Sequence, residues 1–330
     1  MITFADVLIT VIFLLILTVP GVLFAKLKLL PKKADAVLSV IVLYCCQPIL
    51  NIVCFQGCSL NQKIALNMLW VVGLAFLVHF LLFLFLKILF AKKSVDERIG
   101  IVKYSSAFST CGGMGVPFLQ LLFSDGAMQA EVLVYCAVVI AVFNILNWTV
   151  GVYFITGDKK QISLKKVLLN PAIISVFIGL LLFLILQKPI VELAVAGTFW
   201  HKVLEKLMKS LHYISDMITP LAMFMIGIKL ADIDLKYIFK NGYIFLASAI
   251  KLLLMPVLTI AIVAFLPISK SVQYTLFFVL AMPCASSGAM MAVKYGKDGE
   301  FASACVLVST ILCALTIPIT YLLMSFMAGL

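Results

Sequence analysis

The residues best suited to bind a ligand lie in two helix-breaking stretches, each in the middle of an apolar segment. They are Ser109-Thr110-Cys111-Gly112-Gly113-Met114-Gly115-Val116-Pro117 and Met282-Pro283-Cys284-Ala285-Ser286-Ser287-Gly288. Glycine has low helix propensity, and proline removes an N–H and clashes with the carbonyl four residues earlier, so each helix opens here. Inside a bilayer, freed backbone groups are tolerated only against protein or a wet cavity. Such paired breaks predict a transporter binding site.

The chemistry expected at these breaks is the binding of an anion. Each helix that restarts presents unpaired N–H groups and the positive end of its dipole. Two converging ends would hold an anion against the backbone of 113–116 and 284–287. The predicted substrate-contact residues of the breaks, with the hydroxyl groups orienting the anion, are Thr110, Gly112, Gly113, Gly115, Pro117, Pro283, Ser286 and Ser287. The alternative is that the glycines only let two helices cross closely, which leaves the prolines unexplained.

Two amides and a histidine are further candidates. Gln47 and Asn51 flank Pro48 at positions i and i+4, so both amides project from one side of a weakened helix. Amides in membranes usually hydrogen-bond between helices, and lining the substrate path is the equal alternative here. His79 titrates near neutrality in water, although a lone His on an apolar helix is more often a packing residue.

Lys251 and Asp216 are the charged candidates, because an ionisable group inside a span costs several kcal/mol unless it is paired or wetted. Lys251 stands roughly ten residues into its apolar segment, about 15 Å along a helix. It has either a structural role or one of snorkelling to the cytoplasmic face, or it attracts the anion directly. Asp216 precedes Pro220 by one helical turn, and it is either a proton or cation site or a residue of the outer interface.

Composition identifies a membrane protein. Of the 330 residues, 64% are hydrophobic and 12% charged, and the mean hydropathy is +1.21. A soluble domain is about one half apolar. The net charge of +11 does not indicate nucleic acid, because the Lys and Arg residues fall between apolar runs. The nine cysteines lack metal-ligand spacing, so we expect buried thiols, no metal and no cofactor.

Ten apolar segments are long enough to cross a bilayer, which takes roughly 20 residues. They lie near 4–24, 35–55, 64–90, 99–123, 130–155, 167–186, 210–230, 241–266, 271–293 and 301–327. Between the sixth and seventh, residues 187–210 carry Trp200, Val203 and Leu207 at helical spacing opposite Lys202, which predicts an amphipathic interfacial helix. The sequence therefore predicts an all-α polytopic membrane protein with ten transmembrane helices.

The loops predict an orientation. Most of the 25 Lys and Arg residues lie in the loops on one side of these spans, for example Lys26, Lys28, Lys159 and Lys160. By the positive-inside rule that side is cytoplasmic, so both termini are extracytoplasmic. We expect a multi-pass protein of the inner, cytoplasmic membrane.

The chain divides into two similar halves. We expect a first five-helix repeat at 1–157, a cytoplasmic linker at 158–166 and a second repeat at 167–330. Pro48 and Pro220 fall at corresponding points of spans two and seven, and Pro117 and Pro283 at corresponding points of spans four and nine. Because five is odd, the second repeat enters from the opposite side, as in alternating-access transporters.

In order and spacing these motifs resemble the auxin efflux carrier family, over essentially the whole chain, and a bacterial member is expected. The segment 112–117 is similar to the family's Asn-Thr-Gly-x-x-Gly-x-Pro break. The segment 216–222, with Gly227, resembles the family's proline-containing helix. Met282-Pro283, Lys294-Tyr295-Gly296 and Ser309-Thr310 fit its final proline and Tyr-Gly loop.

The resemblance implies a fold like that of PIN carriers and of bile-acid and sodium/proton carriers. Spans four and nine would cross at their prolines, between a scaffold and a mobile transport domain that moves as an elevator. Bacterial members are linked to dicarboxylate and other organic-acid permeation, so the resemblance implies a malate permease-like activity. One position departs from the family: its Asn aligns with Thr110, which implies a substrate other than the plant hormone.

The function expected from the sequence is transport of a small organic anion, such as a mono- or dicarboxylate, and not enzyme catalysis. No nucleotide-binding Gly-rich loop is present, so a gradient must drive transport. A proton- or sodium-coupled symporter that uses Asp216 or His79 is the alternative, and a channel or a non-transporting sensor is a weaker one. The expected partners are the anion and the lipid bilayer, with a homodimer left open.

Overall fold

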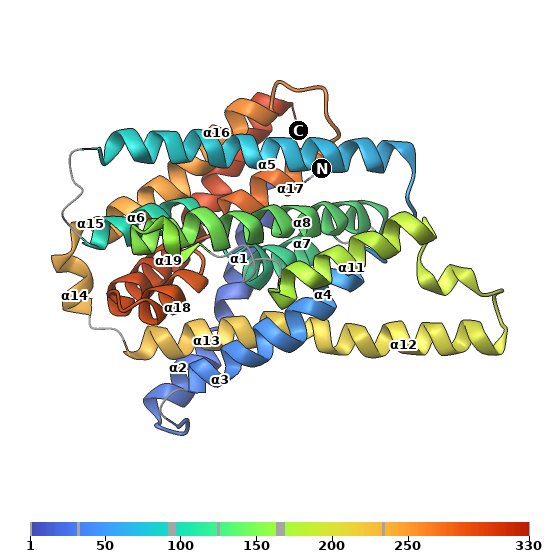
Figure 1. Ribbon diagram of the computed structural model, residues 1–330, viewed down its shortest axis with the longest axis horizontal. Helices are drawn as coiled ribbons and strands as arrows, with labels where there is room; N and C mark the ends of the chain where they lie inside the picture. Colours follow the sequence, from blue (N-terminus) through green and yellow to red (C-terminus); the bar gives the residue numbers. More distant parts are fainter. Residues whose placement is uncertain are drawn as a thin grey trace.

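The computed structural model describes residues 2–31, 34–91, 97–123, 126–162, 169–232 and 235–329. Within these ranges the chain is helical, and its β-structure is one bridged residue pair. The helices pack into a bundle, beyond which α12 (Phe199–Asp216) extends (Figure 1). The two ends of the chain lie close together, where Tyr321 Oη donates to Ile2 O at 3.0 Å. The predicted all-α polytopic fold is confirmed.

Eight segments of the described residues form helices that are long and apolar enough to cross a membrane. They are Phe4–Lys26, Ala34–Cys54, Gln62–Leu89, Gly126–Thr156, Pro171–Leu193, Phe199–Ala231, Gly242–Val263 and Gly299–Ala328. These correspond to eight of the predicted spans. The other two, spans four and nine, are each divided into shorter helices. The two predicted breaks are therefore present, while the count of ten spans stays a prediction.

The divided spans have matching layouts. Span four consists of α6 (Glu97–Ala107), then the π-helical turn η2 (Cys111–Gly115) and α7 (Val116–Leu122). Span nine consists of α17 (Lys270–Ala281) and α18 (Ser287–Lys294). In both, an extended segment separates the two helical parts.

The remaining helices follow the order of the predicted spans. They are α1 (Phe4–Ile16), α2 (Val19–Lys26), α3 (Ala34–Ile41), η1 (Val42–Cys46), α4 (Gln47–Cys54), α5 (Gln62–Leu89), α8 (Gly126–Leu146), η3 (Asn147–Gly151), α9 (Val152–Thr156), η4 (Lys159–Gln161), α11 (Pro171–Leu186), η5 (Ile190–Leu193), α13 (Ile218–Asp232), α14 (Leu235–Lys240), α15 (Gly242–Ala249), η6 (Ile250–Leu254), α16 (Met255–Val263) and α19 (Gly299–Ala328).

Polar residues in front of the helices determine where several of them begin. Thr3 caps α1 in a reciprocal arrangement with Asp6. Asn61 Oδ1 accepts a hydrogen bond from Ile64 N at 2.9 Å before α5, and Asp298 caps α19 in the same way at 2.8 Å. Each cap satisfies an N–H group that has no partner within its helix, which stabilises the helix by about 1 kcal/mol.

Three of the π-helical turns stand directly before prolines. η1 precedes Pro48, η2 precedes Pro117 and η6 precedes Pro256, and each proline is the second residue of the α-helix that follows. A proline ring clashes with the carbonyl four residues earlier. A π turn widens the helix, because its hydrogen bonds reach one residue further back, and this relieves the clash. The prolines thus produce wide turns in the middle of three apolar segments.

The helix–helix contacts are concentrated in two groups. In the first, α2 packs on α13, and α4 packs on α11 and α12. In the second, α5 and α17 pack on α8, and α19 packs on α15 and α18. The π turn η2 packs on α7 and α8 and belongs with the second group, and α1 packs on α19. Contacts of α8 with α4 and α11, and of η2 with α13, join the two groups. The roles of these groups as scaffold and transport domain, and a motion between them, stay predictions.

Two glycines permit the closest helix contact of the first group. A Cβ on Gly21 of α2 would lie 2.1 Å from Phe224 O, and a Cβ on Gly227 of α13 would lie 2.1 Å from Thr18 O. Both distances are far shorter than a van der Waals contact between non-bonded atoms, so only glycine fits at either position. Small residues of this kind let membrane helices pack backbone against backbone.

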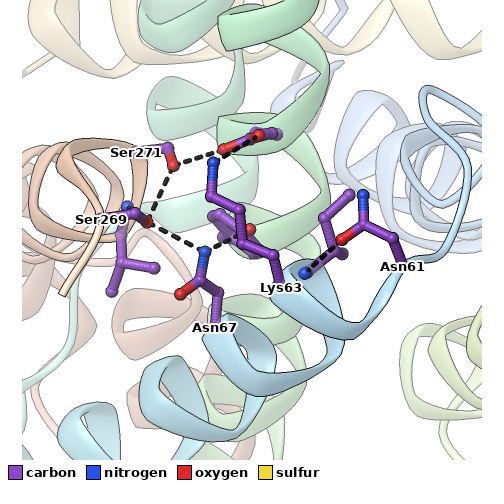
Figure 2. A network of polar contacts seen from close by, with 9 residues as sticks. Asn61, Lys63, Asn67, Ser269 and Ser271 are labelled. Carbon is purple, nitrogen blue, oxygen red and sulfur yellow. Dashed lines mark hydrogen bonds and ion pairs between the residues drawn. The ribbon is translucent and has the colours of Figure 1, made fainter.

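A polar network joins α5, α8 and the start of α17 (Figure 2). Asn67 Nδ2 donates to Tyr135 Oη and to Ser269 Oγ, both at 3.0 Å. The hydroxyl oxygens of Ser269 and Ser271 are 3.0 Å apart, and Ser271 donates to Glu131. These contacts tie three helices of the second group together.

The amphipathic segment predicted at 187–210 is mostly helical and continues as α12. Its apolar side chains Trp200, Val203 and Leu207 are exposed. An interfacial position for this helix stays a prediction, as do the repeat boundaries at 1–157 and 167–330. Residues 163–166 of the predicted linker lie outside the described residues.

Candidate functional site

The two breaks meet as short segments without helical structure, 108–110 and 283–285, which we call the crossing. Ser109 and Cys284 form an antiparallel bridge, and Thr110 N donates to Pro283 O at 2.9 Å. A second bond between the same segments, also 2.9 Å long, runs from Ala285 N. These bonds satisfy backbone groups that both helices release, as a bilayer requires. The breaks are therefore held together by backbone hydrogen bonds.

Four backbone N–H groups beside the crossing have no acceptor in the described part of the chain. They belong to Gly112, Gly113, Ser286 and Ser287. All four residues are partly exposed, whereas their neighbours Cys111 and Ala285 are buried. The first N–H groups of a helix lack partners within it and attract negative charge.

This set of open amides differs from the predicted ranges 113–116 and 284–287. The N–H groups of Met114 and Gly115 donate to Thr110 O at 3.1 and 3.2 Å, and Cys284 N donates to Ser309 Oγ at 3.0 Å. The π turn uses the first two of these donors and the Ser309 side chain the third, while Ala285 N donates across the crossing. Two amides therefore remain available at each helix start.

Thr110 and Gln47 approach the first pair of open amides. Thr110 is partly exposed, and its hydroxyl makes no hydrogen bond to the described residues. It lies 3.1 Å from the place that a Cβ on Gly113 would take. Gln47 Oε1 lies 2.5 Å from the corresponding point on Gly112, and Ala222 of α13 is 3.6 Å from that on Gly113. Side chains of the first group thus border amides of the second.

Ser286 and Ser287 border the other pair, and they differ in what they offer. Tyr104 Oη donates to Asn147 Oδ1 at 2.6 Å and lies 2.8 Å from Ser287 Oγ. Since a phenol has one hydrogen, Ser287 must donate to Tyr104, and its lone pairs stay open. The Ser286 hydroxyl has no partner among the described residues and remains free to donate.

Asn51 has a structural position. It is fully buried, and its Nδ2 donates to Ala172 O at 3.1 Å and to Ser175 Oγ at 3.0 Å on α11. Gln47 Nε2 donates to Asn51 Oδ1 at 3.0 Å. Asn51 therefore joins α4 to α11 and orients the Gln47 amide, and of the two residues Gln47 is the one that lies beside Gly112.

Lys251 lies in the π turn η6, and its side chain is directed at the crossing and not at the membrane surface. It is fully buried. Its Nζ donates to Ser109 Oγ and, at 2.9 Å, to Leu280 O in the last turn of α17. A snorkelling ammonium would reach water, which this buried ammonium does not. A structural role and the attraction of an anion both stay predictions.

His79 and Asp216 lie apart from the open amides. His79 is buried, its Nδ1 is 2.7 Å from Ala75 O, and its ring contacts Phe83 and Phe108. Its Nε2 has no partner in the described residues. Asp216 is exposed at the end of α12 and makes no hydrogen bond or ion pair with them.

The remaining predicted residues shape the backbone. Pro283 lies within the extended segment, whereas Pro117 is in the helix that restarts after η2. The two prolines therefore do not occupy corresponding places, since the bridge pairs Ser109 with Cys284. Gly115 packs against Met282, whose Cγ is 3.7 Å from its Cβ position.

Tyr104 is a contact of the site that sequence reasoning missed. It is buried on α6 and, together with Asn147 of η3, it positions Ser287. The available signal was weak, because a single tyrosine within an apolar run looks like any packing residue. An amide such as Asn147 is expected to hydrogen-bond between helices, wherever in a span it stands.

The arrangement offers hydrogen-bond donors. Within the described ranges no group of three or more His, Cys, Asp or Glu side chains could hold a metal ion. Four open amides and the Thr110 and Ser286 hydroxyls suit an oxyanion such as a carboxylate.

Comparison with known proteins gives the family. The search of curated proteins found no match. A family model described as a membrane transport protein matches residues 6–321, nearly the whole chain and both breaks. The chain therefore belongs to this family of membrane transport proteins, the auxin efflux carrier family.

Proposed function

We propose that the protein is a secondary carrier that moves small organic anions, such as mono- or dicarboxylates, across the cytoplasmic membrane. The observation that carries the proposal is the group of open donors at the crossing: four amides without acceptors in the described residues and two free hydroxyls, all on partly exposed residues. In an apolar environment, unsatisfied donors are costly unless a ligand or water pairs with them. A carboxylate is the ligand that pairs with several N–H groups at once.

The site borders both helix groups, which supports alternating access of the elevator type. Gly112 and Gly113 belong to the second group, while Gln47 and Ala222, which face them, belong to the first. If the second group slides along the first, the donors travel with it and meet a different wall. An anion bound to them would then be released on the other side of the membrane. In the proposed orientation both termini are extracytoplasmic.

The test is uptake by the purified protein in proteoliposomes. Radiolabelled pyruvate, lactate, malonate and succinate are offered under a potassium-diffusion potential, with protein-free liposomes as the blank. We expect potential-dependent uptake of at least one of them. No uptake of any carboxylate by folded protein, or ohmic single-channel currents, would contradict a carrier of organic anions.

A matched pair of variants tests whether the anion binds at the crossing. Gly112→Ala puts a methyl group 2.5 Å from Gln47 Oε1 and beside the open amides. The fold should tolerate this methyl group, because the end of the Gln47 side chain can move away from it. The methyl group would still occupy space that the anion needs. Gly73→Ala on α5 meets no atom within 4 Å and is the control. The added methyl group should keep the anion from the Gly112 N–H, and losing one hydrogen bond to a charged group lowers uptake by about tenfold or more. We expect no decrease for Gly73→Ala.

A further inference from the structure

Lys251 is a buried ammonium with no carboxylate partner in the described residues. It is 0% exposed, and its two acceptors, Ser109 Oγ and Leu280 O, are uncharged. The ion pairs found in the described ranges lie elsewhere, at Lys63–Glu131 and Arg98–Asp298. The titratable groups that interact with Lys251 are the thiols of Cys111 and Cys284 and the His79 imidazole. A buried charge needs compensation, and nothing in this surrounding is an obligatory anion.

The crossing itself carries no other formal charge. Residues 108–115 and 280–288 contain no Asp, Glu, Lys or Arg. Two helical segments end there, α6 and α17, and two begin there, η2 with α7 and α18. Each helix end is equivalent to roughly half a charge, positive at a beginning and negative at an end. The four ends nearly cancel, so the net charge of the crossing is that of Lys251.

We propose that Lys251 is a fixed counter-cation, which matches the crossing to an anion of single charge and takes the place of a co-transported cation. This rests on the proposed function and adds the charge class of the substrate and the coupling. The ligands of the ammonium, a hydroxyl and a carbonyl oxygen, are those that a free monovalent cation would use. Because the cation is covalently attached, it cannot be released with the substrate, and each cycle carries one negative charge.

The first arm of the experiment compares pyruvate, which carries one charge at neutral pH, with malonate, which carries two. Uptake into proteoliposomes is measured with and without sodium. We expect pyruvate uptake to be at least about tenfold faster than malonate uptake, since the second charge would be buried without a partner. Pyruvate uptake should be independent of sodium and driven by a membrane potential. Equal rates for the two anions, or a sodium requirement, would overturn the proposal.

The second arm removes the charge. Lys251→Ala deletes the ammonium and leaves space for n-propylammonium, which matches the part removed. Lys251→Met keeps the volume, so a folded variant without the charge is available. Both should slow pyruvate uptake by about tenfold or more. Lys103→Ala on α6 is the control, because the Lys103 ammonium lies over the Phe90 ring at 5.9 Å and outside the crossing.

Rescue distinguishes a cation position from a packing role. n-Propylammonium should restore part of the pyruvate uptake of Lys251→Ala and raise its melting temperature, without effect on the unsubstituted protein. Tetramethylammonium has no N–H and should do neither. Absence of both effects, or wild-type pyruvate uptake by Lys251→Ala, would overturn the proposal.

The two proposals fail in different ways. If the unsubstituted protein carries none of the four carboxylates, pyruvate, lactate, malonate and succinate, but n-propylammonium still stabilises Lys251→Ala, the carrier function and the charge matching are wrong and the cation position stands. If the protein carries pyruvate and the Lys251 variants carry it equally well, the carrier function stands and the role of Lys251 is wrong.

Discussion

Ser109 and Cys284 face each other in an antiparallel bridge at the point where both divided spans cross. Ser109 also accepts a hydrogen bond from Lys251 and donates to Leu280 O at 3.2 Å, so this residue connects three helical segments. The bridge fixes the spacing between the two helix starts. The open donors of both breaks therefore stay in one place relative to each other.

The bridge can be tested by disulfide formation. Bridged residues have Cα atoms about 4.5 to 5.5 Å apart, a distance that a disulfide spans. In a variant whose only cysteines are native Cys284 and the one introduced by Ser109→Cys, oxidation should link the two halves of the chain. The link is detected on a gel after cleavage at a protease site inserted near Lys160. The same variant with Cys284→Ser must show none, and failure to link under strong oxidant would count against the crossing.

Pro117 is expected to keep the wide turn of η2 in place. Pro117→Ala restores an N–H, which can bond the carbonyl four residues earlier and convert the π turn to an ordinary α-turn. The open amides of Gly112 and Gly113 would rotate, so carboxylate uptake should fall by about tenfold or more. Pro20→Ala is the matched control, because Pro20 also stands at the start of a helix, α2, but outside the crossing. Normal uptake by folded Pro117→Ala would contradict this role.

Tyr104 is expected to stabilise the fold and to position Ser287. Tyr104→Phe removes one hydroxyl and leaves Asn147 Oδ1 and Ser287 Oγ buried or partly buried without it. We expect a loss of about 1 to 3 kcal/mol in the free energy of unfolding, together with slower uptake. Tyr153→Phe provides the comparison, since Tyr153 is exposed. Equal melting temperatures of Tyr104→Phe and the parent would refute the prediction.

Cys58 provides a test of orientation through its pH dependence. Burial raises the pKa of the Cys58 thiol to about 11, and the charge of Glu131 adds to the shift. The thiolate is the reactive form, so labelling should accelerate by about 100-fold from pH 7 to pH 9, both below the raised pKa. Glu131→Gln lowers the pKa again and should speed labelling at pH 7.

The reagent is a membrane-impermeant thiosulfonate applied to sealed vesicles of known sidedness. With extracytoplasmic termini, the loop that holds Cys58 is extracytoplasmic, and only that side should be labelled. Cys58→Ser shows the background from other cysteines, most of which are buried. Labelling from the cytoplasmic side alone would reverse the predicted orientation.

The two helix breaks could be predicted from the sequence, but the side chains that contact the site could not. Gly112, Gly113 and Pro283 disfavour a helix locally, so their effect can be predicted without knowing what surrounds them. The contact of Tyr104 with Ser287 joins residues far apart in the chain, and no local pattern marks it. Lys251 was ambiguous because helical rise gives depth in the membrane and not the direction of the side chain. In the structure the Lys251 side chain is directed toward the crossing.

Binding of pyruvate to the purified protein tests whether the open donors of the crossing hold a carboxylate. The dissociation constant of pyruvate is determined from its effect on the melting temperature, for the parent and for the double variant Thr110→Val with Ser286→Ala. Pyruvate should stabilise the parent, and its dissociation constant should increase by about tenfold or more in the double variant. An unchanged dissociation constant in a folded double variant would contradict it.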